Sequence, residues 1–357
     1  MTSRKSTLSL KDGAGKLPEK FSALKNRRIL VTGAAGFIGG AVFNRLVGYG
    51  LDPVATVLYH EEAEVLRQKG YAAFVLDLTS DIPWDDILNG IDIVFHIAAM
   101  FQEVGLGRRA YEKANHHGAL KLAETAKRMG AERFVHCSTV GVLGDVKEIP
   151  ATEATPFNPM DEYHETKLAG ELAILDWGKT IPEGSMVVTV NRPAMVYGPG
   201  DLRMLKLFKA ILSNKFVMIG SGDTLAHLGY IEDQVDSFLL CAVAPRENVH
   251  LEAFNIASGK PMSLNKLCEL IAHIGGVTLP RPKVPVGPVW LAGLVCEGVC
   301  KPFGIRPPLF RRRVGFFTHN RAFDYTKAKI KLGYMPVWDE GAGISETIRW
   351  YKENHWL

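Results

Sequence analysis

Tyr163 and Lys167 have side chains that could together move a proton at neutral pH. They are four residues apart, so on a helix both side chains emerge from one face. A phenol with a pKa of about 10 is a weak base, and an ammonium group close to it lowers that pKa by favouring the phenolate. The pair therefore indicates general acid/base chemistry. An exposed helix pair without a catalytic role is the alternative, because this spacing is common.

Two hydroxyl side chains, Ser138 and Thr139, follow a run of residues typical of a strand, Arg133–Cys137. The helix expected next along the chain, Glu162–Trp177, carries Tyr163 near its start. The segment with the two hydroxyls therefore immediately precedes, in the order of elements, the helix that carries the predicted acid/base pair.

Three glycines, Gly33, Gly36 and Gly39, lie directly after the expected first strand and run into the next helix. A chain that turns tightly, approaches a pyrophosphate and packs a helix on a sheet lacks side chains at such points. The helix N-terminus would present free N–H groups to the phosphates. The spacing predicts a dinucleotide site, with a merely structural turn as the alternative.

Short β-branched runs alternate with longer amphipathic runs from Arg28 to Asn191, as in a parallel sheet covered by helices on both faces. The expected strands are Ile29–Thr32, Val54–Leu58, Ala73–Leu76, Ile91–Ile97, Arg133–Cys137 and Met186–Val190. The expected helices are Phe37–Tyr49, Glu61–Lys69, Arg109–Met129 and Glu162–Trp177. Glycines at 70, 90, 130 and 184 suit left-handed caps.

The predicted fold is α/β: a doubly wound parallel sheet of the Rossmann type with a smaller C-terminal substrate-binding lobe. We expect a flexible basic tail over residues 1–27 and the dinucleotide-binding domain over 28–191. Residues 192–357, which are rich in turns and prolines, would form mainly the substrate-binding lobe.

These motifs resemble the extended branch of the short-chain dehydrogenase/reductase superfamily, the NAD-dependent epimerase/dehydratase type, over about residues 28–350. The resemblance implies a catalytic trio of Thr139, Tyr163 and Lys167, in which Thr139 would bond the substrate oxygen. It implies cofactor contacts from Gly33, Gly36, Phe37, Ile38, Gly39, Asp77, Leu78, Ala98, Ala99, Asn115, Tyr163, Lys167 and Pro193. For Asp77 alone, a helix cap or a solvated turn is the alternative. The implied reaction moves a hydride between a secondary alcohol and nicotinamide.

The end of the second expected strand bears on the choice between NAD and NADP. Tyr59 and His60 stand there, followed by Glu61 and Glu62, and the next basic residue is Arg67. Two carboxylates would repel the additional phosphate of NADP, so NAD is the expected cofactor, with NADP not excluded.

Composition bounds the remaining function classes. A formal net charge of +4 over 357 residues does not indicate nucleic-acid binding, and five scattered cysteines predict neither a disulfide framework nor a metal site. The N-terminal residues lack the apolar core of a signal peptide, and no apolar run is long enough to span a membrane. We expect a cytoplasmic protein with a small-molecule substrate, and a homodimer, which is common in the resembled family.

Departures from the resembled family narrow the substrate. Val140 and Gly141 replace the Asp-Glu pair of sugar-nucleotide 4,6-dehydratases, and Ala226 replaces the arginine with which epimerases hold a diphosphate. Compensation for that arginine by Arg203, Lys206 or Lys209 is the alternative. The C-terminal third resembles 3β-hydroxysteroid and sterol dehydrogenases, and an apolar helix beside arginines over residues 290–313 (Trp290 to Arg313) suits a membrane surface. A helix packed over the cleft is the alternative reading of that segment.

The first hypothesis is therefore a dehydrogenase for a hydrophobic, sterol-like or lipid-linked secondary alcohol. The second is a nucleotide-sugar epimerase, in which the ketone intermediate would be reduced from its other face. A third, a non-catalytic protein that keeps the fold and the nucleotide, would have no need of Thr139, Tyr163 and Lys167.

Overall fold

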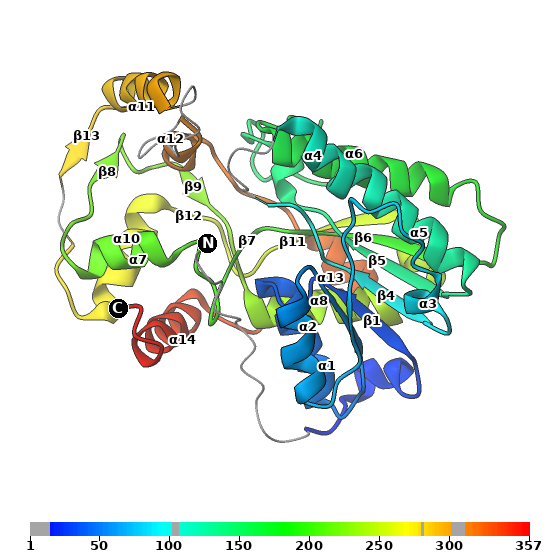
Figure 1. Cartoon of the computed structure of the whole chain (residues 1–357). Helices are drawn as coiled ribbons and strands as arrows, with labels where there is room; N and C mark the ends of the chain where they lie inside the picture. Colours follow the sequence, from blue (N-terminus) through cyan, green and yellow to red (C-terminus); the bar gives the residue numbers. More distant parts are fainter. Residues whose placement is uncertain (1–14, 102–106, 280–281, 301–310) are drawn as a thin grey trace.

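Seven parallel strands form the central sheet of the protein, which is described here by a computed structural model covering residues 15–101, 107–279, 282–300 and 311–357 (Figure 1). In spatial order the strands are β11 (Glu252–Ile256), β6 (Val187–Pro193), β5 (Arg133–Cys137), β4 (Ile93–His96), β1 (Ile29–Thr32), β2 (Val54–Val57) and β3 (Ala73–Val75). The parallel order and the flanking helices confirm the predicted Rossmann-type α/β fold.

Helices cover both faces of this sheet. One face packs on α1 (Phe37–Gly48) and α8 (Ile231–Val243), the other on α5 (Ala119–Arg128) and α6 (Glu162–Gly178). Successive side chains of a strand point to opposite faces, so Ile29 and Val31 belong to the α1 and α8 core whereas Leu30 belongs to the α5 and α6 core.

The helix and strand ends follow local chemistry. The Asp161 carboxylate accepts a hydrogen bond from the His164 N–H at 2.9 Å and so caps the start of α6. The glycines predicted to adopt left-handed conformations do so, with φ values of 89°, 70°, 93° and 77° at Gly70, Gly90, Gly130 and Gly184. Helix α2 (His60–Gln68) and the short helix α3 (Asp85–Leu88) occupy the β2–β3 and β3–β4 connections.

The seventh strand comes from the C-terminal half of the chain. Strand β11 pairs with β6, which runs three residues beyond its expected end and reaches Pro193. The boundary expected after residue 191 thus lies inside β6, and the later half of the chain supplies both β11 and the covering helix α8.

A second group of elements forms the lobe beyond the sheet's β11 side (Figure 1). Among its described residues the strands form three two-stranded sheets: β7 (Met195–Tyr197) with β10 (Leu228–Tyr230), β9 (Leu225–Ala226) with β12 (Met262–Ser263), and β8 (Met218–Ile219) with β13 (Lys283–Val284). Its helices are α7 (Leu205–Leu212), α10 (Leu264–Gly275), α11 (Val286–Cys300), α12 (Arg311–Thr318) and α14 (Glu340–Glu353), while α9 (Arg246–Val249) and α13 (Thr326–Leu332) pack beside β11.

The second half of the expected tail forms regular structure. Residues 1–14 lie outside the described residues, but Glu19–Leu24 form a 3₁₀ helix whose Phe21 and Leu24 side chains are fully buried. This helix packs on α8, and Lys20 forms an ion pair of 2.8 Å with Asp236. The second half of the expected tail thus includes a helix, because two of its apolar side chains join the core.

Within the described ranges, no helix has the length and apolar composition needed to cross a membrane.

Candidate active site

The turn after β1 is closed by backbone packing that only glycine permits. Gly33 has φ of 68°, and a Cβ atom on it would lie 3.0 Å from the Ala98 Cα. A Cβ atom on Gly39 would lie 2.2 Å from the Gly33 carbonyl oxygen. Helix α1 then starts at Phe37 and Ile38, whose N–H groups belong to the unsatisfied first turn. This bare turn at a helix N-terminus fits the pyrophosphate of a dinucleotide.

Thr32 joins this turn to the end of β4. Its Oγ1 accepts hydrogen bonds from the N–H groups of Ile97 and Ala98, each at 3.0 Å. Ala98 and Ala99 are half-buried and follow β4, where the sequence predicted the wall of the nicotinamide ribose site. The structure thus brings the glycine turn and this predicted wall together at the carboxyl edge of the sheet.

Asn115 braces the segment after β4 against α6. It lies in a π-helical stretch, Lys113–Gly118, and is 1% exposed. Its side-chain oxygen accepts from the Met100 N–H at 2.8 Å, while its amide donates to the Met100 carbonyl at 3.0 Å and to the Thr166 Oγ1 at 3.2 Å. These bonds engage both ends of the amide, so Asn115 connects Met100 to Thr166 of α6.

Tyr163 is half-buried in the first turn of α6, and its ring packs against two other rings. The centroid of Phe101, in the segment after β4, lies 4.8 Å away at 81°, and that of His164 lies 5.2 Å away. The Arg203 guanidinium lies over both Phe101 and Phe37, at 6.0 and 5.1 Å from the ring centroids. Tyr163 is thereby linked through Phe101 to the glycine turn.

Lys167 is 1% exposed, and its ammonium lies 3.5 Å from the His136 Nε2. Burial lowers the pKa of Lys167, while Cys137 and Glu171 act in the opposite direction. Burial raises the pKa of the Cys137 thiol to about 11. Glu171 is itself held by the buried Arg192, whose Nε lies 3.0 and 3.1 Å from the two carboxylate oxygens.

The two candidate hydroxyls differ in their surroundings. The Thr139 Oγ1 accepts from the Gly141 N–H at 3.0 Å and caps the 3₁₀ turn Val140–Leu143. The buried Ser138 Oγ has no hydrogen-bond partner among the described residues. Neither hydroxyl donates its own proton in a hydrogen bond among the described residues, so both stay candidates for binding a substrate oxygen.

The His164 ring packs directly against the backbone of Gly141. A Cβ atom on Gly141 would lie 2.2 Å from two atoms of the His164 ring. Glycine at this position is therefore a packing requirement of the Tyr163–His164 segment.

The remaining predicted cofactor residues lie at strand ends of the same sheet. Asp77 is exposed after β3, and its carboxylate accepts from the Thr79 N–H and hydroxyl, both at 2.8 Å. Leu78 is buried, and Pro193 is the last residue of β6. The turn considered for Asp77 is thus present, and it leaves the residue at the solvent-exposed end of the predicted site.

Three neighbours of the trio were missed by sequence reasoning: Phe101, His136 and His164. Arg203 was considered only as a cation for a diphosphate, and its place over Phe37 and Phe101 was not expected. The sequence carried one usable signal, because His96 and His136 each stand near the end of an expected strand.

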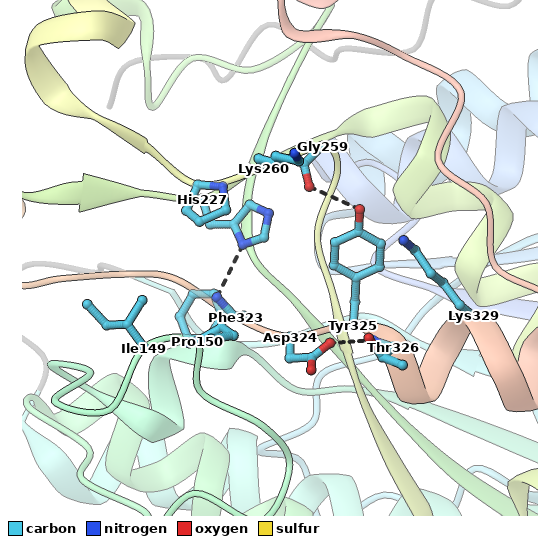
Figure 2. Close-up of a pocket in the computed structure, with 11 residues that line it drawn as sticks. Ile149, Pro150, His227, Gly259, Lys260, Phe323, Asp324, Tyr325, Thr326 and Lys329 are labelled. Carbon is cyan, nitrogen blue, oxygen red and sulfur yellow. Dashed lines mark hydrogen bonds between the residues drawn. The ribbon is translucent and has the colours of Figure 1, made fainter.

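A cavity of about 330 Å³ lies apart from these residues, between the loop that follows β11 and the start of α13 (Figure 2). Gly259, Tyr325 and His227 line it, with the Tyr325 hydroxyl donating to the Gly259 carbonyl and His227 accepting from the Phe323 N–H. None of Thr139, Tyr163 and Lys167 lines this cavity, so it is separate from the candidate active site.

A Rossmann-type sheet, a glycine turn at its carboxyl edge and a Tyr-Lys helix beside that turn define a dinucleotide-dependent enzyme of the short-chain dehydrogenase/reductase type. The model of the NAD dependent epimerase/dehydratase family matches residues 29–257. The chain therefore belongs to the NAD-dependent epimerase/dehydratase family, which confirms the resemblance and identifies an NAD-dependent oxidoreductase or epimerase.

Individual relatives are distant but match nearly the full chain. A 3-beta-hydroxysteroid dehydrogenase of Mycolicibacterium neoaurum is 25% identical, and the match covers 91% of this chain and 92% of the relative. A decarboxylating sterol-4-alpha-carboxylate 3-dehydrogenase of Candida albicans is 26% identical, with 91% and 98% covered.

Solved structures share the whole architecture. A UDP-glucose 4-epimerase from Thermotoga maritima superposes with a TM-score of 0.72 at 25% identity, covering 92% of this chain and 99% of that chain. A UDP-glucuronic acid 4-epimerase from Bacillus cereus, solved in complex with NAD, gives a TM-score of 0.73 at 21% identity with the same coverage.

Proposed function

We propose that this chain is an NAD-dependent dehydrogenase that interconverts a hydrophobic secondary alcohol and its ketone, with Tyr163 as the general acid/base. The main support is that the Tyr163 ring packs on Phe101. Phe101 belongs to the segment after β4, and Ala98 of the same segment lies against Gly33. These contacts support a reaction centre between α6 and the glycine turn.

NAD, when bound, supplies a two-electron acceptor for the hydride that leaves the carbinol carbon. Tyr163, as the phenolate, takes the proton of the substrate hydroxyl, and Lys167 stabilises the phenolate that precedes this transfer. Thr139 donates a hydrogen bond to the substrate oxygen and holds it beside Tyr163. The buried setting of Lys167 strengthens its electrostatic effect, since water does not screen it.

A hydrophobic substrate is favoured over a nucleotide sugar by the surroundings of Ala226. Ala226 is 1% exposed and pairs with Met262 between β9 and β12, so this position supplies no cation for a diphosphate. Arg203 binds Asp201 and the Val196 carbonyl, and Lys209 donates to the Trp356 carbonyl. The two relatives named for steroid or sterol substrates agree with this preference.

The epimerase remains the second candidate, because a UDP-glucose 4-epimerase is 25% identical over nearly the full chain. Turnover of sterols, other secondary alcohols and nucleotide sugars with NAD separates the two. Net formation of NADH is expected. Inverted stereochemistry at a sugar carbon without net formation of NADH would contradict the dehydrogenase proposal and support the epimerase.

Tyr163→Phe tests the chemistry itself. The variant lacks the group that takes the proton, so turnover should fall by about 100-fold or more. NADH binding, followed by fluorescence titration, should be largely retained, which separates lost chemistry from lost folding. Unchanged turnover of any accepted substrate in Tyr163→Phe would contradict the proposed mechanism.

We also propose that α11 touches a membrane surface and so brings the enzyme to a lipid-like substrate. The helix is apolar, and exposed side chains include Trp290, Leu291, Val295 and Val299, at 44%, 57%, 57% and 60%. It stands at the outer edge of the lobe (Figure 1). An apolar, exposed helix of 15 residues is too short to span a bilayer but can lie in its interface. Residues 301–310 of the expected segment lie outside the described residues.

A further inference from the structure

Three polar side chains form a row across the middle of the sheet. Thr32 on β1 is in register with His96 on β4, and His96 is in register with His136 on β5. All three point to the face covered by α5 and α6, because Leu30, Val94 and Phe134, two positions earlier on each strand, belong to that core. Their exposed fractions are 0%, 1% and 0%.

The hydrogen bonds at one end of the row fix the tautomer of His96. The Thr32 Oγ1 already accepts from the N–H groups of Ile97 and Ala98, which occupy its two lone pairs. Its own proton is therefore the one in the 3.0 Å bond to the His96 Nδ1. His96 accepts at Nδ1, and its neutral ring carries the proton on Nε2.

The other end of the row meets the candidate active site. The His136 Nε2 lies 3.5 Å from the Lys167 ammonium, which has no lone pair, so His136 must be the acceptor. The ionisable groups that act on His136 are Lys167 from α6 and His96 from β4. Those that act on Lys167 include Cys137 from β5 and Glu171 from α6. Burial and the nearby ammonium keep the pKa of His136 well below its ordinary value, so the imidazole stays neutral and able to accept.

This row of polar side chains in the core lowers the stability of the fold. The His96 Nε2 and the His136 Nδ1 are buried and have no hydrogen-bond partner among the described residues. Unpaired buried polar atoms destabilise a fold, and apolar side chains in these positions would avoid that cost. Stability alone therefore does not account for imidazoles under α6.

We propose that His136 is a positioning residue for the reaction: its neutral imidazole holds the Lys167 ammonium on the side of α6 that carries Tyr163. The inference rests on the proposed chemistry of Tyr163 and Lys167. Without this acceptor, the buried lysine would lose its proton more readily or turn away. In either case its effect on the phenol would weaken, and the pKa of Tyr163 would rise.

Variants of the full chain can separate the effect of the hydrogen-bond acceptor on His136 from the effect of its side-chain volume. His136→Phe keeps a ring and removes the acceptor, His136→Met removes the acceptor with a flexible chain, and His136→Gln keeps an acceptor oxygen. The ultraviolet absorbance of tyrosinate is titrated with pH in each variant. Each titration is repeated in a protein that also carries Tyr163→Phe, and the difference between the two curves gives the titration of Tyr163 alone. We expect a shift to higher pH of at least about 0.5 units in His136→Phe and His136→Met. His136→Gln should titrate close to the wild type.

The outcomes distinguish this inference from the proposed function. If Tyr163→Phe removes a titrating phenol and turnover, but His136→Phe and His136→Met titrate like the wild type, the role of His136 is wrong and the function stands. If Tyr163→Phe changes neither titration nor turnover, the proposed function itself fails. An equal shift in His136→Gln and His136→Phe would also overturn the inference, because retention of the acceptor would then not matter. Should His136→Phe not fold, His136→Met against His136→Gln gives the same comparison.

Discussion

His96 and His136 couple the stability of the fold to pH. Burial, and secondarily Lys167, lower the pKa of His96 to about 3, and the same causes shift His136 in the same direction. An unfolded chain binds protons on both rings below a pH of about 6.5, whereas the folded chain does not. The free energy of unfolding is therefore not reduced by these two rings above this pH. It decreases as the pH drops from about 6.5 towards 3.

Urea unfolding between pH 7.5 and pH 5 measures this effect. Each buried imidazole can contribute a slope of up to about 1.4 kcal/mol per pH unit. In His96→Leu, the slope of the free energy of unfolding against pH should be smaller than in the wild type by a measurable part of that amount. A variant as steep as the wild type would show that His96 takes up its proton without unfolding.

The candidate trio could be named from the sequence because its information is local. Tyr163 and Lys167 are four residues apart, and Thr139 lies in a short motif after a strand, where the resemblance to the family implied a catalytic hydroxyl. Their catalytic roles stay predictions until variants are measured. His136 could not be assigned in this way, because its contact with Lys167 depends on the order of β4 and β5 and on where α6 crosses them. The same holds for Arg203, which reaches Phe37 and Phe101 from the far half of the chain.

At the level of elements, the crossing of α6 with the π-helical stretch is set by Gly170. A Cβ atom there would lie 2.0 Å from the Asn115 carbonyl oxygen, which is backbone and cannot turn aside. We expect Gly170→Ala to destabilise the protein by about 1–3 kcal/mol and to lower turnover, since the brace at Asn115 and the helix of Tyr163 would separate.

Gly48 provides the matched control for this substitution. It also lies in a helix, α1, but a Cβ atom on it would meet nothing within 4 Å. Gly48→Ala should leave stability unchanged or raise it by up to about 1 kcal/mol. Thermal unfolding of both variants tests the pair, and equal effects would mean that helix propensity rather than close packing governs Gly170.

Most strands of the sheet could be predicted, because periodicity and β-branching are local signals. Strands β1 and β5 agree with their expected bounds, and β4 is shorter than expected at both ends. Strand β11 was not predicted: its five residues follow a short helix, and only pairing with β6 makes them part of the sheet. Short strands were expected in the lobe, but the two-residue strands could not be given bounds for the same reason, since tertiary pairing defines them.

At the scale of the molecule, α11 should decide membrane binding. Flotation of the full chain with vesicles of phosphatidylcholine and phosphatidylserine should recover the wild type and lose Leu291→Glu/Val295→Glu, because carboxylates oppose burial in the interface. Ile330→Glu is the control, since Ile330 is 77% exposed on α13. Equal recovery of all three proteins would exclude α11 as the contact.

The homodimer also stays a prediction at this scale. Helices α5 and α6, the counterparts of those that pair in the resembled family, leave side chains such as Leu172 exposed at 39%. Sedimentation equilibrium should give twice the chain mass of 39.3 kDa, and Leu172→Arg should lower the association. A monomer at micromolar concentration would contradict the expectation.

During translation, β6 leaves the ribosome long before β11. Until then the outer edge of β6, whose seven residues are all buried in the finished protein, lacks its neighbour and can pair with other chains. Nascent enzyme is therefore exposed to aggregation while the residues between β6 and β11 are being synthesised. Substitutions that slow completion of the sheet should lower the yield in cells even where the mature enzyme is as stable as before.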